Sequence, residues 1–278
     1  MGEMNSVEPP VPVPVQTIAQ DRRIRLVWRN PEGGLTYELG AASERCFVKW
    51  APRGAPIDLS REAARFTWAS AFIPVPRVLE QGVDGDGSWM VTTPVPGESA
   101  VSPRWSADPA RAVTAIGRGL RALHDALPVE RCPFACSAED QVRAIRRADA
   151  GGRLDPADWD EVHRHLGVGR ALDLLSAIPP IDRLVVCHGD ACAPNTLIGS
   201  DGVFSGHVDL GSMGVADRWA DLAVATWSAG WNYGTDWEQP LLAAYGIVLD
   251  LERTRYYRLL YDLAPRQAPS ERHWPRTR

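Results

Sequence analysis

The chain has 278 residues, 45% of them hydrophobic, so it can bury a full core as one two-lobed unit or as two closely joined domains. Its formal net charge of -5 excludes a general electrostatic attraction for nucleic acid or anionic membranes, and a cationic small molecule is the better-matched partner. No apolar run approaches the roughly 20 residues of a membrane span, and the five scattered cysteines indicate free thiols in a reducing compartment. We expect a cytoplasmic monomer or weak dimer.

The first part of the chain predicts a flexible arm followed by a small β-rich lobe. Four prolines between residues 9 and 14 favour an extended arm over residues 1–20. Over residues 21–95, short β-prone runs predict an antiparallel sheet with one helix, near Leu59 to Ala71, packed on it. The predicted strands are Arg25 to Arg29, Thr36 to Gly40, Cys46 to Trp50, Arg77 to Gln81 and Trp89 to Thr93.

Residues 96–264 predict a mainly helical lobe, followed by a flexible tail at 265–278. The exception is the segment from Leu184 to Ser212, where two β-prone runs, Leu197 to Ile198 and Gly206 to Val208, predict a hairpin. The whole pattern predicts an α+β fold with a small antiparallel N-terminal lobe and a larger helical C-terminal lobe. The predicted helices are Pro109 to Ala126, Ala138 to Ala148, Pro156 to His165, Gly169 to Ser176, Trp219 to Ala229, Asp236 to Ala244 and Leu251 to Leu263.

The predicted hairpin and the loop before it carry the densest group of chemically informative residues. The string from His188 to Asn195 has the form H-G-D-x-x-x-x-N, and Asp209-Leu210-Gly211 follows fourteen residues after Asn195. This spacing matches the catalytic loop and the metal-binding D-x-G of protein kinases. It predicts Asp190 as the catalytic base that accepts or orients the acceptor hydroxyl, with Asn195 and Asp209 as magnesium ligands. An ordinary turn and a surface acid would explain each triplet alone, but not the joint spacing.

Six further residues fit a nucleotide site. Lys49 lies in a β-prone run, the setting of the kinase lysine that contacts nucleotide phosphates, and Glu62 follows thirteen residues later in the predicted helix, where it could pair with Lys49. Gly33 and Gly34 lie in a turn that could cover the phosphates through backbone N–H groups. The backbone of Thr93 and Val95 is positioned to contact the adenine edge, since Pro94 has no N–H.

These motifs resemble the bacterial aminoglycoside O-phosphotransferases, which share the fold of protein kinases. The resemblance rests on His188 to Asn195, on the string Gly214 to Ala223, on Phe47-Val48-Lys49, on Glu62 to Arg65 and on Val95-Pro96-Gly97. It implies ATP or GTP as the phosphoryl donor, two magnesium ions, and a hydroxyl of a cationic antibiotic as the acceptor. It assigns the same roles to Lys49, Asp190, Asn195 and Asp209 as the residue patterns do.

The chain departs from the family where the acceptor is expected to bind. Ser212 stands where the family has the arginine of D-x-G-R, and an aromatic stretch with Trp227, Ser228, Trp231 and Tyr233 replaces acidic residues. These residues either pack on a helix or line an acceptor site for a flatter ligand, such as the tuberactinomycin peptides viomycin and capreomycin. The acids of the segment from Asp155 to Glu161, with Asp155 and Asp158 foremost, either cap a helix or form a lid over a cationic ligand.

Two alternatives stay open at the level of sequence. One is a kinase of the same fold that acts on a small metabolite, such as an amino alcohol or a sugar. The other is a nucleotide-binding pseudokinase, which Ser212 and the irregular glycine turn suggest. The complete set of Lys49, Glu62, Asp190, Asn195 and Asp209 favours an active antibiotic kinase over both.

Overall fold

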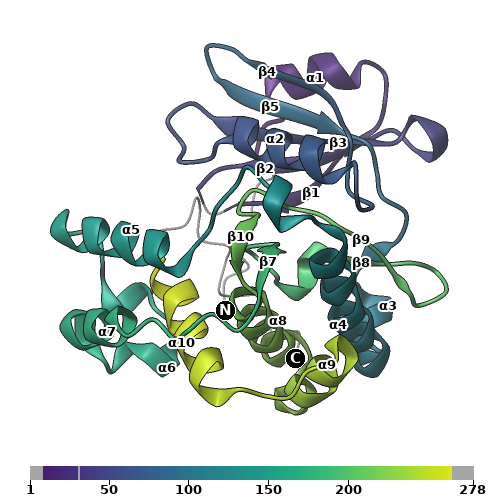
Figure 1. Ribbon diagram of the computed structural model, residues 1–278. Coiled ribbons are helices and arrows are strands. Elements are labelled where there is room, and N and C mark those ends of the chain that lie inside the picture. Colours follow the sequence, from purple (N-terminus) through teal and green to yellow (C-terminus); the bar gives the residue numbers. More distant parts are fainter. Residues whose placement is uncertain (1–8, 31, 265–278) are drawn as a thin grey trace, which may run out of the picture.

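A five-stranded antiparallel sheet forms the N-terminal lobe, with its strands in the order β1-β2-β3-β5-β4 (Figure 1). The computed structural model describes residues 9–30 and 32–264. Each strand begins and ends within two residues of its predicted position. The strands are β1 (Ile24–Arg29), β2 (Leu35–Leu39), β3 (Cys46–Pro52), β4 (Val78–Val83) and β5 (Gly87–Thr92).

One helix covers each face of this sheet. Tyr37 of β2 lies opposite Val48 of β3, and both pack against α1 (Val13–Ala19). Lys49 and its cross-strand partner Met90 lie on the other face, because successive residues of a strand point to opposite sides. The helix α2 (Leu59–Ala69) covers this second face. The expected helix therefore packs on the side of the sheet that carries Lys49.

The helix α1 corrects the prediction of an extended arm over residues 1–20. Pro14 lies in the first turn, where the missing N–H of proline costs no helical hydrogen bond. Val15 and Ala19 are fully buried against the sheet, so burial of this apolar stripe outweighs the extended preference of the proline-rich segment. Residues 1–8 of the predicted arm, and the predicted tail at 265–278, lie outside the described residues.

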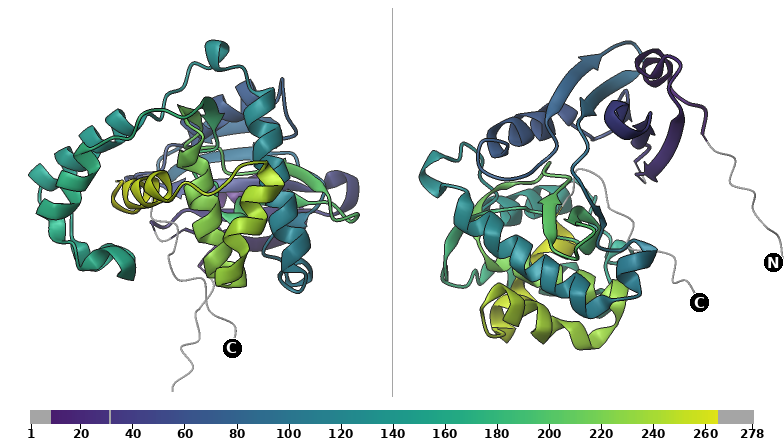
Figure 2. Two further views of the ribbon diagram at one scale, coloured as in Figure 1. Left: turned by 60° about the horizontal axis from the view of Figure 1, so that its bottom comes forward. Right: turned by 90° about the vertical axis from the view of Figure 1, so that its right-hand side faces the viewer.

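The C-terminal lobe is mainly helical, as predicted, and the two-lobed α+β fold is confirmed (Figures 1 and 2). The long helix α4 packs against α9 and the strands that follow the linker, and α5, α6 and α7 lie on the other side of the lobe, where α10 connects them to the rest of it (Figure 1). In the described part of the chain, no helix is long and apolar enough to cross a membrane. The helices are α3 (Pro103–Ser106), α4 (Pro109–Ala126), α5 (Ala138–Ala150), α6 (Glu161–Arg164), α7 (Gly167–Ser176), α8 (Trp219–Tyr233), α9 (Glu238–Tyr245) and α10 (Leu251–Leu263).

The prediction of a single helix from Pro156 to His165 is wrong. The structure has a 3-10 turn at Pro156–Asp158 and the short helix α6, separated by Trp159 in extended conformation. Two carboxylates cause the break, because Asp155 accepts a hydrogen bond from the amide of Ala157 and Asp160 accepts one from the amide of Val162. Each of them caps a separate turn.

Two small β units flank the predicted catalytic loop. The hairpin of β8 (Thr196–Ile198) and β9 (Phe204–His207) confirms the predicted pair, and β6 (Glu98–Ser99) adds a third strand from the interlobe linker. The sequence did not indicate β7 (Leu184–Cys187) and β10 (Gly214–Asp217), which pair antiparallel. The catalytic loop leaves β7, and the residues from Asp209 onward lead into β10.

Gly117 sets how closely α4 packs on α9. A Cβ at this position would lie 2.5 Å from the backbone carbonyl oxygen of Leu241. We expect Gly117→Ala to lower the free energy of unfolding by about 1–3 kcal/mol, since overpacking against backbone outweighs the better helix propensity of alanine. Gly230→Ala in α8, where no heavy atom lies within 4 Å of the added Cβ, should stabilise by up to about 1 kcal/mol. Urea unfolding of both variants measures these changes. A change in unfolding free energy with the same sign in both variants would contradict this role of Gly117.

His207 in β9 couples stability to pH. Burial and, to a smaller extent, the charge of the nearby His188 lower the pKa of His207 to about 3. Below the unfolded value of about 6.5 only the unfolded chain takes up the proton, so stability is complete above that pH and falls by about 1.4 kcal/mol per pH unit below it. We expect His207→Leu to reduce the loss of unfolding free energy between pH 7.5 and 5.5, measured by urea denaturation. An unchanged pH dependence would refute this.

Candidate active site

The buried carboxylate of Asp221 in α8 anchors the catalytic loop. Its Oδ2 accepts a hydrogen bond from the amide of His188 at 2.6 Å, and its Oδ1 accepts one from the amide of Gly189 at 2.9 Å. The Nε2 of His124 in α4 lies 2.9 Å from Oδ2, and the Nδ1 of the same ring meets the hydroxyl of Tyr245. Burial alone would raise the pKa of Asp221, but the hydrogen bond and charge of His124 lower it.

This cluster has the residue types of a metal site but is already engaged with protein donors. His124, Cys187 and Asp221 bring potential ligand atoms within 4.8 Å of one another. Both oxygens of Asp221 accept backbone hydrogen bonds, and the thiol of Cys187 donates to the carbonyl of Asp217. We therefore interpret the cluster as the anchor of the loop.

Gly189 and His188 hold the loop against the segment that carries Asp209. Gly189 has a φ of +81°, and a Cβ there would lie 2.1 Å from the carbonyl oxygen of Ser212, so only glycine fits. The fully buried ring of His188 donates from Nε2 to the carbonyl of Val208 at 2.9 Å and accepts at Nδ1 from the amide of Asp190. The loop and the Asp209 segment are thus one rigid unit.

The carboxylate of Asp190, the predicted base, has a protein partner at each oxygen. The hydroxyl of Tyr261 donates to Oδ1 at 2.6 Å, and the Nδ2 of Asn195 lies 3.3 Å from Oδ2. Asn195 also donates from Nδ2 to the carbonyl of Asp190 at 2.9 Å, which leaves its amide oxygen as the atom it presents to a cation. The amide of Val208 donates to the carbonyl of Asn195, so the strand leading to Asp209 lies against Asn195.

Lys49, Glu62 and Asp209 meet in one ion-pair network. The Nζ of Lys49 lies 2.6 Å from Glu62 Oε1 and 3.1 Å from Asp209 Oδ1. Burial alone would lower the pKa of Lys49, but the two carboxylates raise it, so the lysine stays charged. Burial raises the pKa of Glu62 to about 7, whereas the attraction of Lys49 overcomes burial and lowers the pKa of Asp209. The predicted pairing of Lys49 with Glu62 is therefore present.

Asp209 is held in a strained backbone conformation that aims its side chain at Lys49. Its φ is +61°, which is uncommon for a residue other than glycine. Its side chain is 48% exposed, unlike that of Glu62 at 7%. Strain of this kind persists where the surroundings fix the backbone, and it concentrates at functional sites.

The glycine turn and the linker offer fewer backbone donors than predicted. The amide of Gly33 donates to the carbonyl of Asn30, and the amide of Glu32 donates to the Asn30 side chain, so both close the turn itself. The Cβ of a residue at Gly34 would lie 2.7 Å from Ile57, which explains the glycine by packing. The amide of Thr93 donates to the carbonyl of Arg77, so Thr93 presents only its carbonyl to a ligand. Val95 is buried, and its side chain lies against Gly206.

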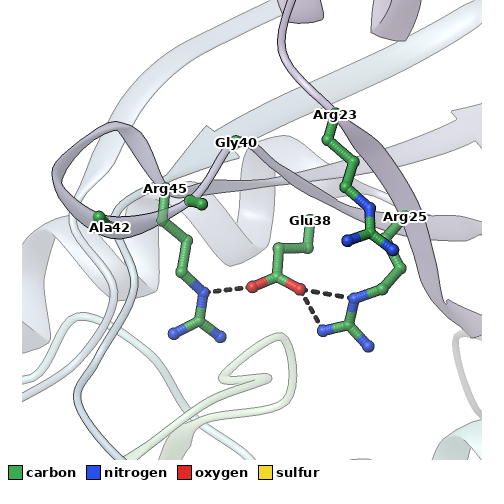
Figure 3. Close-up of a pocket in the computed structure, with 7 residues that line it drawn as sticks. Arg23, Arg25, Glu38, Gly40, Ala42 and Arg45 are labelled. Atoms are coloured by element: carbon green, nitrogen blue, oxygen red, sulfur yellow. Dashed lines mark hydrogen bonds and ion pairs between the residues drawn. The ribbon is translucent and has the colours of Figure 1, made fainter.

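A second polar cluster lies around Glu38 on the Lys49 face of the sheet. Glu38 of β2 is paired across the strands with Phe47, two residues before Lys49, and therefore shares its face. Figure 3 shows the carboxylate of Glu38 between Arg25 and Arg45, with which it forms ion pairs. Burial alone would raise the pKa of Glu38, but the two arginines lower it. A hollow of about 360 Å³ opens here, and Arg45 lies over the ring of Phe47 at 5.0 Å.

A cleft of about 290 Å³ opens beside Asp190, between α2, α5 and α10. Ser212, which stands where the D-x-G-R arginine is replaced, lines it together with Arg61 and Arg65 of α2. Arg65 is buried and donates from Nε to the carbonyl of Met213 at 2.8 Å. Other residues along the walls are Ala135, Cys136, Asp140, Gln141, Ala144, Gly189, Gly211, Ala220, Tyr257, Leu260, Tyr261 and Ala264.

None of the six predicted acceptor residues lines this cleft. Ser228 is buried and its hydroxyl accepts a hydrogen bond from the amide of Ala193 at 2.9 Å, so it supports the catalytic loop. The hydroxyl of Tyr233 donates to the carbonyl of Ala100 at 2.7 Å. Trp227 packs between the rings of His163 and Trp231, with ring centroids 5.5 Å and 4.8 Å away, respectively.

The remaining predicted acceptor residues are on the surface and do not line the cleft. Asp155 and Asp158 are exposed at the 3-10 turn before α6, where Asp155 caps the turn. The side chain of Trp231 is 43% exposed. Trp227 thus packs on neighbouring rings, and Asp155 caps the turn before α6.

The site contains residues that the sequence did not single out. Asp221 lies in the string Gly214 to Ala223, which was used only for the resemblance, and its anchoring role follows from the amides around it. Tyr261 is 71 residues from Asp190 in the chain, and no local pattern relates the two positions. The sequence offers one signal for Tyr261: Tyr257 lies four residues earlier in the predicted helix, and this spacing puts both tyrosines on one helix face.

Comparison with known proteins agrees with this geometry. The model of the phosphotransferase enzyme family matches residues 32–257. An aminoglycoside 3'-phosphotransferase of Streptomyces fradiae is 36% identical over 244 residues, covering 82% of this chain and 90% of that protein. A streptomycin 3''-kinase of Streptomyces griseus is 34% identical over 232 residues, covering 78% of this chain and 84% of that protein.

Solved structures show the same relationship. The crystal structure of an aminoglycoside 3'-phosphotransferase of type VIII has a TM-score of 0.75 and 34% identity, covering 87% of this chain and 93% of that one. An aminoglycoside phosphotransferase of Streptomyces rimosus, in complex with ADP and streptomycin, has a TM-score of 0.72 and 31% identity, covering 90% and 95% of the two chains. The chain belongs to the phosphotransferase enzyme family and, within it, to the aminoglycoside O-phosphotransferases.

Proposed function

We propose that this enzyme is an antibiotic kinase that transfers the γ-phosphoryl group of ATP to a hydroxyl of an aminoglycoside. One observation carries the proposal. Asp190 borders a cleft, and the His188–Val208 hydrogen bond ties its loop to the segment of Asp209, which belongs to the ion-pair network with Lys49 and Glu62. The relatives named above act on aminoglycosides or streptomycin. A related structure contains ADP, so ATP is the proposed donor, and GTP is the alternative donor to test.

The proposed mechanism assigns a task to each part of the site. Lys49, kept charged by Glu62 and Asp209, offers a cation to the nucleotide phosphates. Asp190 accepts a hydrogen bond from the acceptor hydroxyl, aligns its oxygen for attack, and takes its proton late in the transfer. Because the phosphoryl-transfer transition state is loose, positioning and positive charge contribute more than proton removal.

The residues present also fit magnesium. The half-exposed carboxylate of Asp209 and the amide oxygen of Asn195 are hard oxygen ligands on segments that the Val208 amide joins. When bound there, magnesium would neutralise charge on the phosphate oxygens. Asn195 keeps its amide oriented through Nδ2, which donates to the carbonyl of Asp190.

The acceptor class is proposed from the cleft. The aromatic residues that suggested a tuberactinomycin peptide do not line it, since Trp227 and Tyr233 have packing or hydrogen-bonding partners elsewhere. Asp140 and Gln141 of α5 offer polar contacts on its wall, and the formal net charge of -5 favours a cationic ligand. An aminoglycoside is therefore the first candidate, and viomycin and capreomycin belong in the same test.

The direct test incubates the purified protein with magnesium and either ATP or GTP. The acceptors are streptomycin, hygromycin B, a 3'-hydroxyl aminoglycoside, viomycin, capreomycin, choline and homoserine. We expect mass spectrometry to find added phosphate on an aminoglycoside, with kcat falling about 10²–10⁴-fold in Asp190→Asn because the carboxylate base is lost. ADP affinity should be retained in this variant. Phosphate found only on choline or homoserine would establish a metabolite kinase instead, and undiminished activity in Asp190→Asn would refute the assigned base.

A further inference from the structure

Tyr261 makes the shortest side-chain contact to the proposed base. Its hydroxyl donates to Oδ1 of Asp190 at 2.6 Å, within the range of a strong hydrogen bond from a hydroxyl to a carboxylate. The hydroxyl oxygen of Tyr261 also lies 3.2 Å from the thiol of Cys192. Because the phenolic proton is directed to Asp190, the thiol is the donor in this second contact. Tyr261 thus touches the catalytic loop at two positions, two residues apart.

This contact completes the fixation of the Asp190 carboxylate. Asn195 holds Oδ2 and the backbone carbonyl of Asp190 from within the loop, and Tyr261 holds Oδ1 from α10. A carboxylate has about four lone-pair directions, so one partner at each oxygen leaves room for a hydroxyl on the open side. Asp190 and Tyr261 both line the cleft, which identifies the cleft as that open side.

The support behind Tyr261 is rigid. α10 packs along α8, the helix whose Asp221 and Ser228 hold the loop backbone. The residues on either side of Tyr261, Leu260 and Asp262, are buried, and Asp262 accepts hydrogen bonds from the amide of Asp160 and the ring of His163. The helix that carries the phenol is therefore fixed relative to the loop that carries the base.

We propose that Tyr261 is a positioning residue for phosphoryl transfer, which holds Oδ1 of Asp190 so that the carboxylate presents its remaining lone pairs to the acceptor hydroxyl. The role rests on the proposed function, since it requires Asp190 to receive an acceptor. It also makes α10 part of the catalytic apparatus as well as a wall of the cleft. A positioning contact acts on the alignment of the reacting oxygen, so its loss lowers kcat more than it changes binding.

The test compares Tyr261→Phe with Tyr256→Phe, using the full-length protein, ATP, magnesium and whichever acceptor the wild type phosphorylates. Tyr256 is a matched control because it also lies on α10 and its hydroxyl also makes a hydrogen bond, to the carbonyl of Leu175 at 3.1 Å. We expect Tyr261→Phe to lower kcat roughly 10- to 100-fold. The KM values for ATP and acceptor should stay within about twofold, and Tyr256→Phe should leave kcat and both KM values near wild type.

A double variant separates positioning from general structural support. In the Asp190→Asn background, adding Tyr261→Phe should cause little further loss of kcat, because residues that act as one unit are not additive. A full multiplicative loss would overturn the proposal. So would an unchanged kcat in Tyr261→Phe, or an unchanged kcat with a lower acceptor KM, which would mean that the phenol merely competes with the acceptor. A wild-type protein without transfer activity would instead contradict the proposed function itself.

Discussion

The catalytic loop depends on one buried carboxylate. Asp221 is fully inaccessible to solvent, and the cost of burying its charge is offset because the amides of His188 and Gly189 and the ring of His124 converge on it. Those amides belong to the first two residues of the catalytic loop. Because the buried carboxylate of α8 needs these hydrogen-bond donors, it fixes the position of a loop that lies 32 residues or more away in the chain.

The same helix supports the far end of the loop. Ser228 lies seven residues after Asp221, about two helical turns, so both side chains lie on one face of α8. Ser228 accepts from the amide of Ala193, close to Asn195. One face of α8 thus contacts both ends of the loop. The helix α10 packs on α8 and adds the hydrogen bond from Tyr261 to Asp190. On the opposite side of the active site, Lys49 connects the N-terminal lobe to Asp209.

The parts of the site that the sequence predicted are those defined by short spacings. His188 to Asn195 and Asp209 lie on one loop and one hairpin, so their separation along the chain constrains their separation in space. The pairing of Lys49 with Glu62 was also predictable, because a strand and the helix that follows it pack together. The proline-rich start was not, since the apolar stripe of α1 forms a helix only when the sheet buries it.

The residues around the cleft were not predictable for a related reason. The sequence shows Trp227 and Tyr233 as conspicuous aromatics, but the hydrogen bonds of Asp221 and Ser228 fix the rotation of α8 and direct those rings to α6 and to the linker. The walls of the cleft come instead from α2, α5 and α10, three helices far apart in the chain. Tyr261 becomes recognisable only when α10 is placed against the loop.

Amide hydrogen exchange at His188 and Gly189 tests the anchoring role of Asp221 most directly. Measured by mass spectrometry or NMR, both amides should be strongly protected in the wild-type protein. In Asp221→Asn, which leaves an acceptor at only one side-chain atom, their protection should fall by at least about tenfold, while that of the sheet strand β3 stays unchanged. Equal protection of these two amides in both proteins would contradict the claim that Asp221 holds the catalytic loop.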